Sequence, residues 1–141
     1  MIKRYFNASI VYASLALACG VFYREFTKYT AFTGKTNLAF LHTHYFMLGM
    51  FFFLALALLE RAFAFSAQKG IKGWVTVYHI GLNITTVCLF LRGLAQATET
   101  MLSPALNGSL SGVSGIGHIL LGSSILALLI LVRRAAVAMK E

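Results

Sequence analysis

The chain has 141 residues, of which 59% are hydrophobic and only 11% are charged, and its formal net charge is +8. It contains a single proline and no aspartate. Because soluble domains carry about 25% charged residues, this composition excludes an ordinary water-soluble fold and predicts a protein whose solvent is the lipid bilayer.

Four apolar stretches are long enough to cross the hydrocarbon core, which takes about 20 helical residues. They cover 5–23, 36–59, 73–91 and 93–132, and the first three contain no Asp, Glu, Lys or Arg. The fourth is too long for one span and contains Glu99, Pro104 and a Gly/Ser-rich segment at 107–117. We therefore expect a loop at 97–112 and one all-α domain over 1–141, with helices at about 4–24, 36–61, 73–97 and 113–134.

The Lys and Arg residues predict the orientation of these helices. One side of the membrane would hold eight of them, and the other side four. The larger set is Lys3, Arg4, Arg61, Lys69, Lys72, Arg133, Arg134 and Lys140, and the smaller set is Arg24, Lys28, Lys35 and Arg92. By the positive-inside rule both termini face the cytoplasm, in a bacterial or archaeal cytoplasmic membrane. Charges placed at span ends also explain the net charge without a nucleic-acid partner.

The first stretch predicts a retained transmembrane helix. A cleaved signal peptide combines a short apolar core with a small-residue cleavage site. This stretch is full length and ends in Phe22, Tyr23 and Arg24.

All four histidines lie in or at a predicted span, where ionisable groups are costly and by default mark a functional site. His42 and His44 lie near the start of the second helix, and His118 lies near the start of the fourth. These two helices run in the same direction, so we expect the three histidines to cluster near the extracytoplasmic face. His79 would lie near the opposite face.

The spacing of His42 and His44 decides what they can bind. Residues two apart point about 200° apart around a helix, so the pair cannot easily hold one ion together. The arrangement instead presents one imidazole to each of two neighbouring sites, as suits a helix standing between two cofactors. The alternative for all three histidines of the cluster is a hydrogen-bonded side chain at the membrane interface.

Other polar and small residues in the spans allow more than one interpretation each. Gly49, Gly115 and Gly122 lie on the same faces as the histidines, and they favour either a bulky planar ligand or close helix packing. His79, Asn83 and Thr86 form a polar stripe that predicts interhelical hydrogen bonds or a path for protons or a polar ligand. Arg92 is suited to a carboxylate such as a haem propionate, to lipid phosphate, or to snorkelling.

The sequence does not contain the residues that several common catalytic and binding sites require. No carboxylate lies within a span, which argues against acid–base hydrolysis and carboxylate-driven ion coupling. The sequence has no phosphate-binding glycine loop, no zinc-type Cys pair and no Cys-x-x-Cys-His haem attachment.

One motif resembles a known family. The second helix begins with a Leu-His-Thr-His sequence that is followed by Met, Leu, Gly and an apolar run, at Leu41, His42, Thr43, His44, Met47, Leu48 and Gly49. This resembles the second helix of the catalytic subunit of haem-copper oxidases, especially cbb-type oxidases and nitric oxide reductases, where Leu-His-Thr supplies a low-spin haem ligand. It also resembles their tenth helix, where a His-x-His pair serves two adjacent haems. The whole chain is similar to small bacterial membrane proteins of unknown function.

The resemblance implies a homotrimer, since that subunit consists of three arcs of four helices and this chain looks like one arc. It implies haem b held between protomers, with His42 of one protomer and His44 of its neighbour as the two iron ligands, in a cytochrome for electron transfer or redox sensing. His118 is the spare candidate for a distal ligand or for copper, and Arg92 for contact with the haem. A quinol or another donor would supply electrons.

This sequence departs from the family where oxygen is reduced. The copper site of the oxidases needs three histidines, two of them adjacent in sequence, and no His-His pair exists here. A haem with two imidazole ligands has no open place for a substrate, so we expect an electron-transfer cytochrome and not an oxidase.

Three alternatives stay open. A haem within one protomer would pair His118 with His42 or His44. A haem-free transporter would bind copper or a polar solute through the histidines. An accessory subunit would serve a larger membrane complex.

Overall fold

A computed structural model describes residues 1–139, and every regular element in that part of the chain is helical. The elements are α1 (Ile2–Tyr29), α2 (Ala39–His44), the π-helical segment η1 (Tyr45–Phe51), α3 (Phe52–Phe63), the 3₁₀ turn η2 (Phe65–Ala67), α4 (Ile71–Ala97) and α5 (Pro104–Ala138). Since α2, η1 and α3 form one continuous rod, the chain has four helices long and apolar enough to cross a membrane. This confirms the expected four spans and indicates an integral membrane protein.

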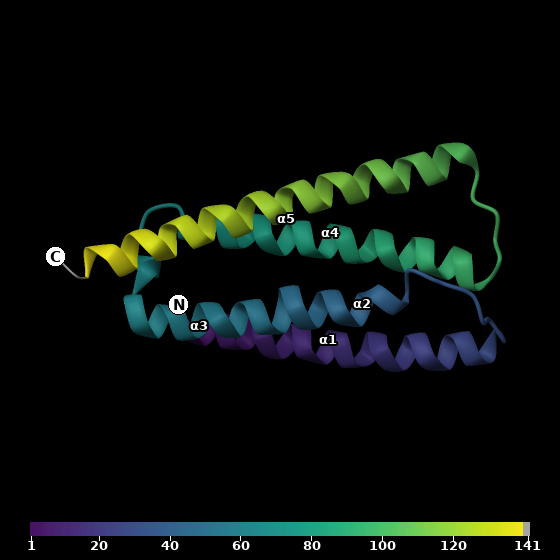
Figure 1. Cartoon of the computed structure of the whole chain (residues 1–141), viewed down its shortest axis with the longest axis horizontal. Helices are drawn as coiled ribbons and strands as arrows, with labels where there is room; N and C mark the ends of the chain where they lie inside the picture. The colour runs from purple at the N-terminus through teal and green to yellow at the C-terminus, as the bar shows by residue number, and fades with distance from the viewer. Residues whose placement is uncertain (140–141) are drawn as a thin grey trace.

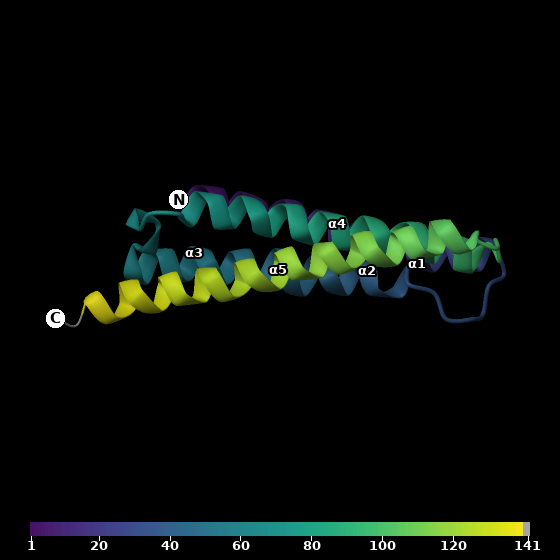
Figure 2. The same cartoon turned by 90° about the horizontal axis from the view of Figure 1, so that it is seen from above.

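The four rods run antiparallel in chain order (Figure 1). Both termini lie at one end of the bundle, which we call the terminal end, and the loops after α1 and α4 lie at the other, the distal end (Figures 1 and 2). Helix α1 packs against the α2–η1–α3 rod and α4 packs along α5. The two pairs meet where α2 contacts α4 at the distal end and where α3 contacts α5 at the terminal end.

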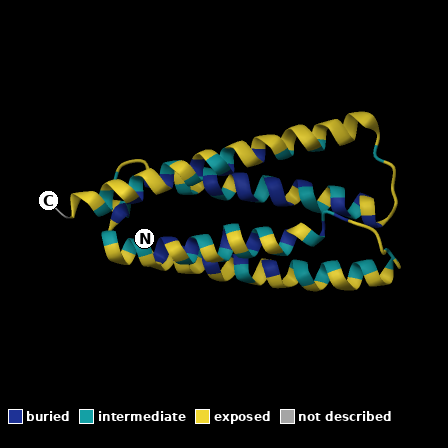
Figure 3. Ribbon diagram, viewed as in Figure 1, coloured by how far each residue is buried: buried dark blue, intermediate teal, exposed yellow. Residues whose placement is uncertain are grey.

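Burial follows the inward faces of the rods, and large apolar side chains cover the outward faces (Figure 3). The core is rich in aromatic rings, with Tyr5, Tyr12, Phe53 and Tyr78 all nearly inaccessible. Outward residues such as Ile10 are more than half exposed. Lipid is the solvent that suits such a surface, because apolar patches of this extent are rare on soluble monomers.

Glycines allow a close approach between α4 and α5. A Cβ at Gly81 would lie 2.6 Å from the backbone nitrogen of Leu121, and a Cβ at Gly117 would lie 2.7 Å from Oγ1 of Thr85. Without a driving force from water, transmembrane helices associate through such close backbone contacts at small residues. Larger residues at these positions would hold the helices apart.

The π-helical segment is locked by side chains from two other helices. A wide π turn disturbs the regular backbone ladder and leaves carbonyls free for other donors. Ser9 of α1 donates to the carbonyl of Met50 at 2.9 Å, and Tyr78 of α4 donates to the carbonyl of Leu48 at 2.5 Å. Gly49 of this segment packs on Tyr12, whose Cβ would lie 2.5 Å from an added methyl group.

Helix α5 begins at Pro104, so the loop expected at 97–112 is wrong beyond Ser103. The hydroxyl of Ser103 caps the helix by accepting from the backbone nitrogen of Leu106, and Pro104 occupies a first-turn position that needs no N–H donor. The glycines at 108, 112 and 115 lie within this helix. Helix α1 is also longer than the expected 4–24.

Candidate functional site

His44 ends α2, immediately before the π-helical segment. Its Nδ1 lies 2.8 Å from the carbonyl oxygen of Phe40, one turn earlier. A carbonyl only accepts, so Nδ1 carries the hydrogen and the lone pair of Nε2 is free. The side chain is half-buried. Nε2 is therefore the ring nitrogen of His44 that is open to a partner outside its own helix.

His42 lies on another side of the same helix, as the spacing predicted. Its Cβ faces α1, 3.7 Å from where a Cβ on Gly20 would be. The ring is half-buried, and its Nδ1 is fully buried without a hydrogen-bond partner in residues 1–139. Buried polar atoms are nearly always paired, so the unpaired Nδ1 of His42 is an exception within the described chain.

His118 shares the local geometry of His44 but lies elsewhere. Its Nδ1 is 2.8 Å from the carbonyl of Ser114, and the side chain is exposed on α5. Helix α5 contacts α4 and α3, whereas α2 contacts α1 and α4. Within the described part of the chain no three His, Cys, Asp or Glu residues come together as a metal site. The fold therefore does not join His118 to the pair on α2.

The histidines nevertheless lie at similar heights along the bundle. Tyr45, next to His44, accepts a hydrogen bond from Thr86 of α4 at 2.8 Å. Gly117, next to His118, packs on Thr85 of α4. This height is closer to the middle of α4 than to its distal end. The three imidazoles are thus deeper along the rods than the sequence predicted.

Arg92 has a structural function that the sequence did not indicate. Its Nη2 donates to the carbonyl and Oδ1 of Asn107, both at 3.0 Å, and to Oγ of Ser111 at 2.8 Å. These bonds hold the first turns of α5 against α4. Gly115 and Gly122, which lie three residues before and four residues after His118, meet nothing within 4 Å, so they are not packing points within this chain.

A polar network in the core joins α1 to α4, and sequence reasoning missed one of its members. Tyr12 lies 2.6 Å from Nδ1 of His79, and Asn83 donates to the hydroxyl of Tyr12 at 3.1 Å. His79 also stacks on Phe53, with ring centroids 4.5 Å apart. The expected stripe of His79, Asn83 and Thr86 thus supplies interhelical hydrogen bonds. The spacing of the buried α1 residues Tyr5, Ser9, Tyr12 and Ala16 was the signal for the missing partner.

Comparison with known proteins gives one match. Residues 2–135 match the family described as "Protein of unknown function (DUF2871)". The chain therefore belongs to this family. No curated protein and no solved structure matches it significantly.

Proposed function

We propose that this member of the DUF2871 family binds haem b at the interfaces of a homotrimer and serves in electron transfer or redox sensing. At each interface, His42 of one protomer and His44 of its neighbour would supply the two ligands of the iron. Closed threefold symmetry lets each α2 segment serve two equivalent sites.

The orientation of His44 is the observation that carries this proposal. Its Nδ1–H is committed to the carbonyl of Phe40 at 2.8 Å, which leaves Nε2 free. Metal-binding histidines almost always donate their second ring N–H to a carbonyl or carboxylate. That bond fixes the tautomer and the ring orientation and makes the ligand more basic.

His42 supplies the second candidate ligand. It lies two residues before His44 on the same helix, so the two rings point in different directions. Its ring is half-buried, and its Nδ1 is not committed to a hydrogen bond within residues 1–139.

The residue pattern supplies the second line of support. The Leu-His-Thr-His sequence at 41–44 resembles haem-binding helices of haem-copper oxidases, and three copies of a four-helix chain would match the twelve helices of that subunit. When bound by two imidazoles, haem b supplies one-electron transfer with no open coordination place. A membrane quinol is a donor of suitable chemistry.

Visible absorption of the protein purified in mild detergent tests the proposal. We expect a sharp α band after reduction with dithionite, three haems per trimer, and loss of the band in His42→Gly and in His44→Gly. Adding imidazole to the His44→Gly protein should restore the band, because free imidazole can occupy the place of the lost ligand. His79→Ala, which removes a histidine on a different helix, should keep the band.

Other outcomes would redirect the assignment. Loss of the band in His118→Ala with retention in His42→Gly would make His118 the second ligand and refute the proposed pair. A colourless protein after expression with a haem precursor would refute haem binding. Metal analysis for copper at His118, and copurification from native membranes, would then test the transporter and accessory-subunit alternatives.

A further inference from the structure

Two adjoining cavities open at the terminal end of the bundle, between α1 and α4. One has a volume of about 400 Å³ and the other about 660 Å³, and both are lined by Arg4 and Lys72. Tyr12 of α1 and His79 of α4 contact each other through their side chains, but the two helix backbones do not pack closely on each other. The cavities therefore lie between two lipid-facing helices, where a lipid molecule can reach them from the side.

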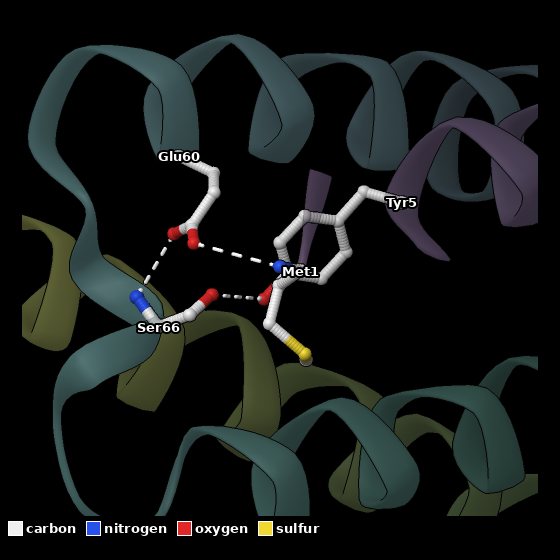
Figure 4. A network of polar contacts seen from close by, with 4 residues as sticks. All are labelled: Met1, Tyr5, Glu60 and Ser66. Atoms are coloured by element: carbon white, nitrogen blue, oxygen red, sulfur yellow. Dashed lines mark hydrogen bonds and ion pairs between the residues drawn. The ribbon is translucent and has the colours of Figure 1, made fainter. Parts of the chain in front are cut away.

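The mouth of this space is strongly cationic. Lys3 lines the larger cavity together with Arg4 and Lys72, and no carboxylate lines either one. None of the three cations forms an ion pair within residues 1–139. Among the described residues, Glu60 is the acidic side chain at this end of the bundle. Its carboxylate pairs with the amino group of Met1 at 3.9 Å and accepts a hydrogen bond from the backbone nitrogen of Ser66 at 2.9 Å (Figure 4).

The inner wall is mainly aromatic and apolar, and it includes the polar side chains of Thr76 and His79. Tyr5, Phe53 and His79 line the smaller cavity. Asn83 Nδ2 donates both to the carbonyl of His79 at 2.8 Å and to the hydroxyl of Tyr12. When this hydroxyl donates its own hydrogen to Nδ1 of His79, the neutral imidazole carries its hydrogen on Nε2. His79 thus offers an N–H donor to a ligand in the cavity.

We propose that this space binds the headgroup and glycerol backbone of an anionic phospholipid. The phosphate oxygens accept hydrogen bonds from Lys3, Arg4 and Lys72, and an ester carbonyl accepts from Nε2–H of His79. The apolar wall, which a soluble phosphate would leave uncovered, packs against the acyl chains. Basic pockets between transmembrane helices recognise anionic headgroups in this way. This inference is independent of haem binding.

Native mass spectrometry of the detergent-purified protein, titrated with phosphatidylglycerol or phosphatidylcholine, tests the proposal. The cavity variant is Lys3→Gln/Arg4→Gln/Lys72→Gln. The matched control is Arg61→Gln/Arg133→Gln/Arg134→Gln, which removes the same charge from exposed positions that line neither cavity. Each cation near an anionic headgroup contributes about fivefold, so we expect the cavity variant to lose affinity for phosphatidylglycerol on the order of a hundredfold. The control should lose less than fivefold.

A second arm tests the inner wall. The wild-type protein should prefer diester over diether phosphatidylglycerol, and His79→Phe, which keeps an aromatic ring on Phe53, should remove that preference. Equal losses in the cavity variant and its control would overturn the site in favour of general surface attraction. Equal binding of phosphatidylcholine would overturn anion recognition, and displacement by millimolar glycerol 3-phosphate would overturn the lipid as ligand.

Discussion

Alanine at Gly81 would place a methyl group against the backbone of α5. Its Cβ would lie 2.6 Å from the nitrogen of Leu121 and 3.0 Å from the carbonyl oxygen of Gly117. Both are backbone atoms, so no side-chain rotation can relieve the overlap and the helices must move apart. Alanine in a helix gains about 0.5–1 kcal/mol over glycine, whereas overpacking of a close contact costs about 1–3 kcal/mol. The overlap dominates, and we expect the free energy of unfolding to fall by about 1–2 kcal/mol.

Unfolding by SDS in dodecyl maltoside micelles, followed by circular dichroism, measures this free energy. Gly73→Ala is the matched control, because Gly73 lies on the same helix and a Cβ there meets nothing within 4 Å. We expect this control to be as stable as the wild type or slightly more stable. If Gly81→Ala proved as stable as Gly73→Ala, the close approach of α4 and α5 would not be a source of stability and the reasoning would be refuted.

Two further substitutions test local contacts. Tyr12→Phe keeps the ring but removes the hydroxyl between His79 and Asn83. We expect the free energy of unfolding to fall by about 1 kcal/mol in the same titration, since interhelical side-chain hydrogen bonds in bilayers average about 0.6 and reach about 1.7 kcal/mol. An unchanged midpoint would show that the network adds no stability. Ser103→Ala removes the cap on the nitrogen of Leu106, at a cost of about 0.5–2 kcal/mol, and should speed hydrogen exchange in the first turn of α5 alone; unchanged exchange there would contradict the capping assignment.

The histidines of α2 were predictable because their relation is local. Two residues apart on a helix means opposite directions, whatever the helix packs against. His42 does face α1, and His44 bonds within its own helix. The assignment of haem to this pair remains a proposal, because no property of a single chain identifies what its neighbour contributes.

Other features could not be predicted because they depend on partners distant in sequence. Tyr12 and His79 are separated by 67 positions, so the polar stripe of α4 predicted interhelical hydrogen bonds without identifying Tyr12 as the partner. Arg92 bonds to Asn107 in the first turns of α5, so its function could be recognised only once the start of α5 was known. The glycine-rich sequence of that start resembles a loop when it is considered alone. The π-helical segment has no sequence signal of its own and is held by donors on α1 and α4.

Four apolar helices and the positions of their histidines followed from the order of residues alone, since hydropathy and helical pitch are properties of consecutive residues. The packed fold was needed to show which glycines are packing points, which carbonyls receive side-chain donors, and that three cations line a cavity between α1 and α4. In a bilayer, apolar helix faces are all compatible with lipid, so the pairing of helices follows from close backbone approach and interhelical hydrogen bonds. Those contacts arise between distant segments and exist once the chain has packed.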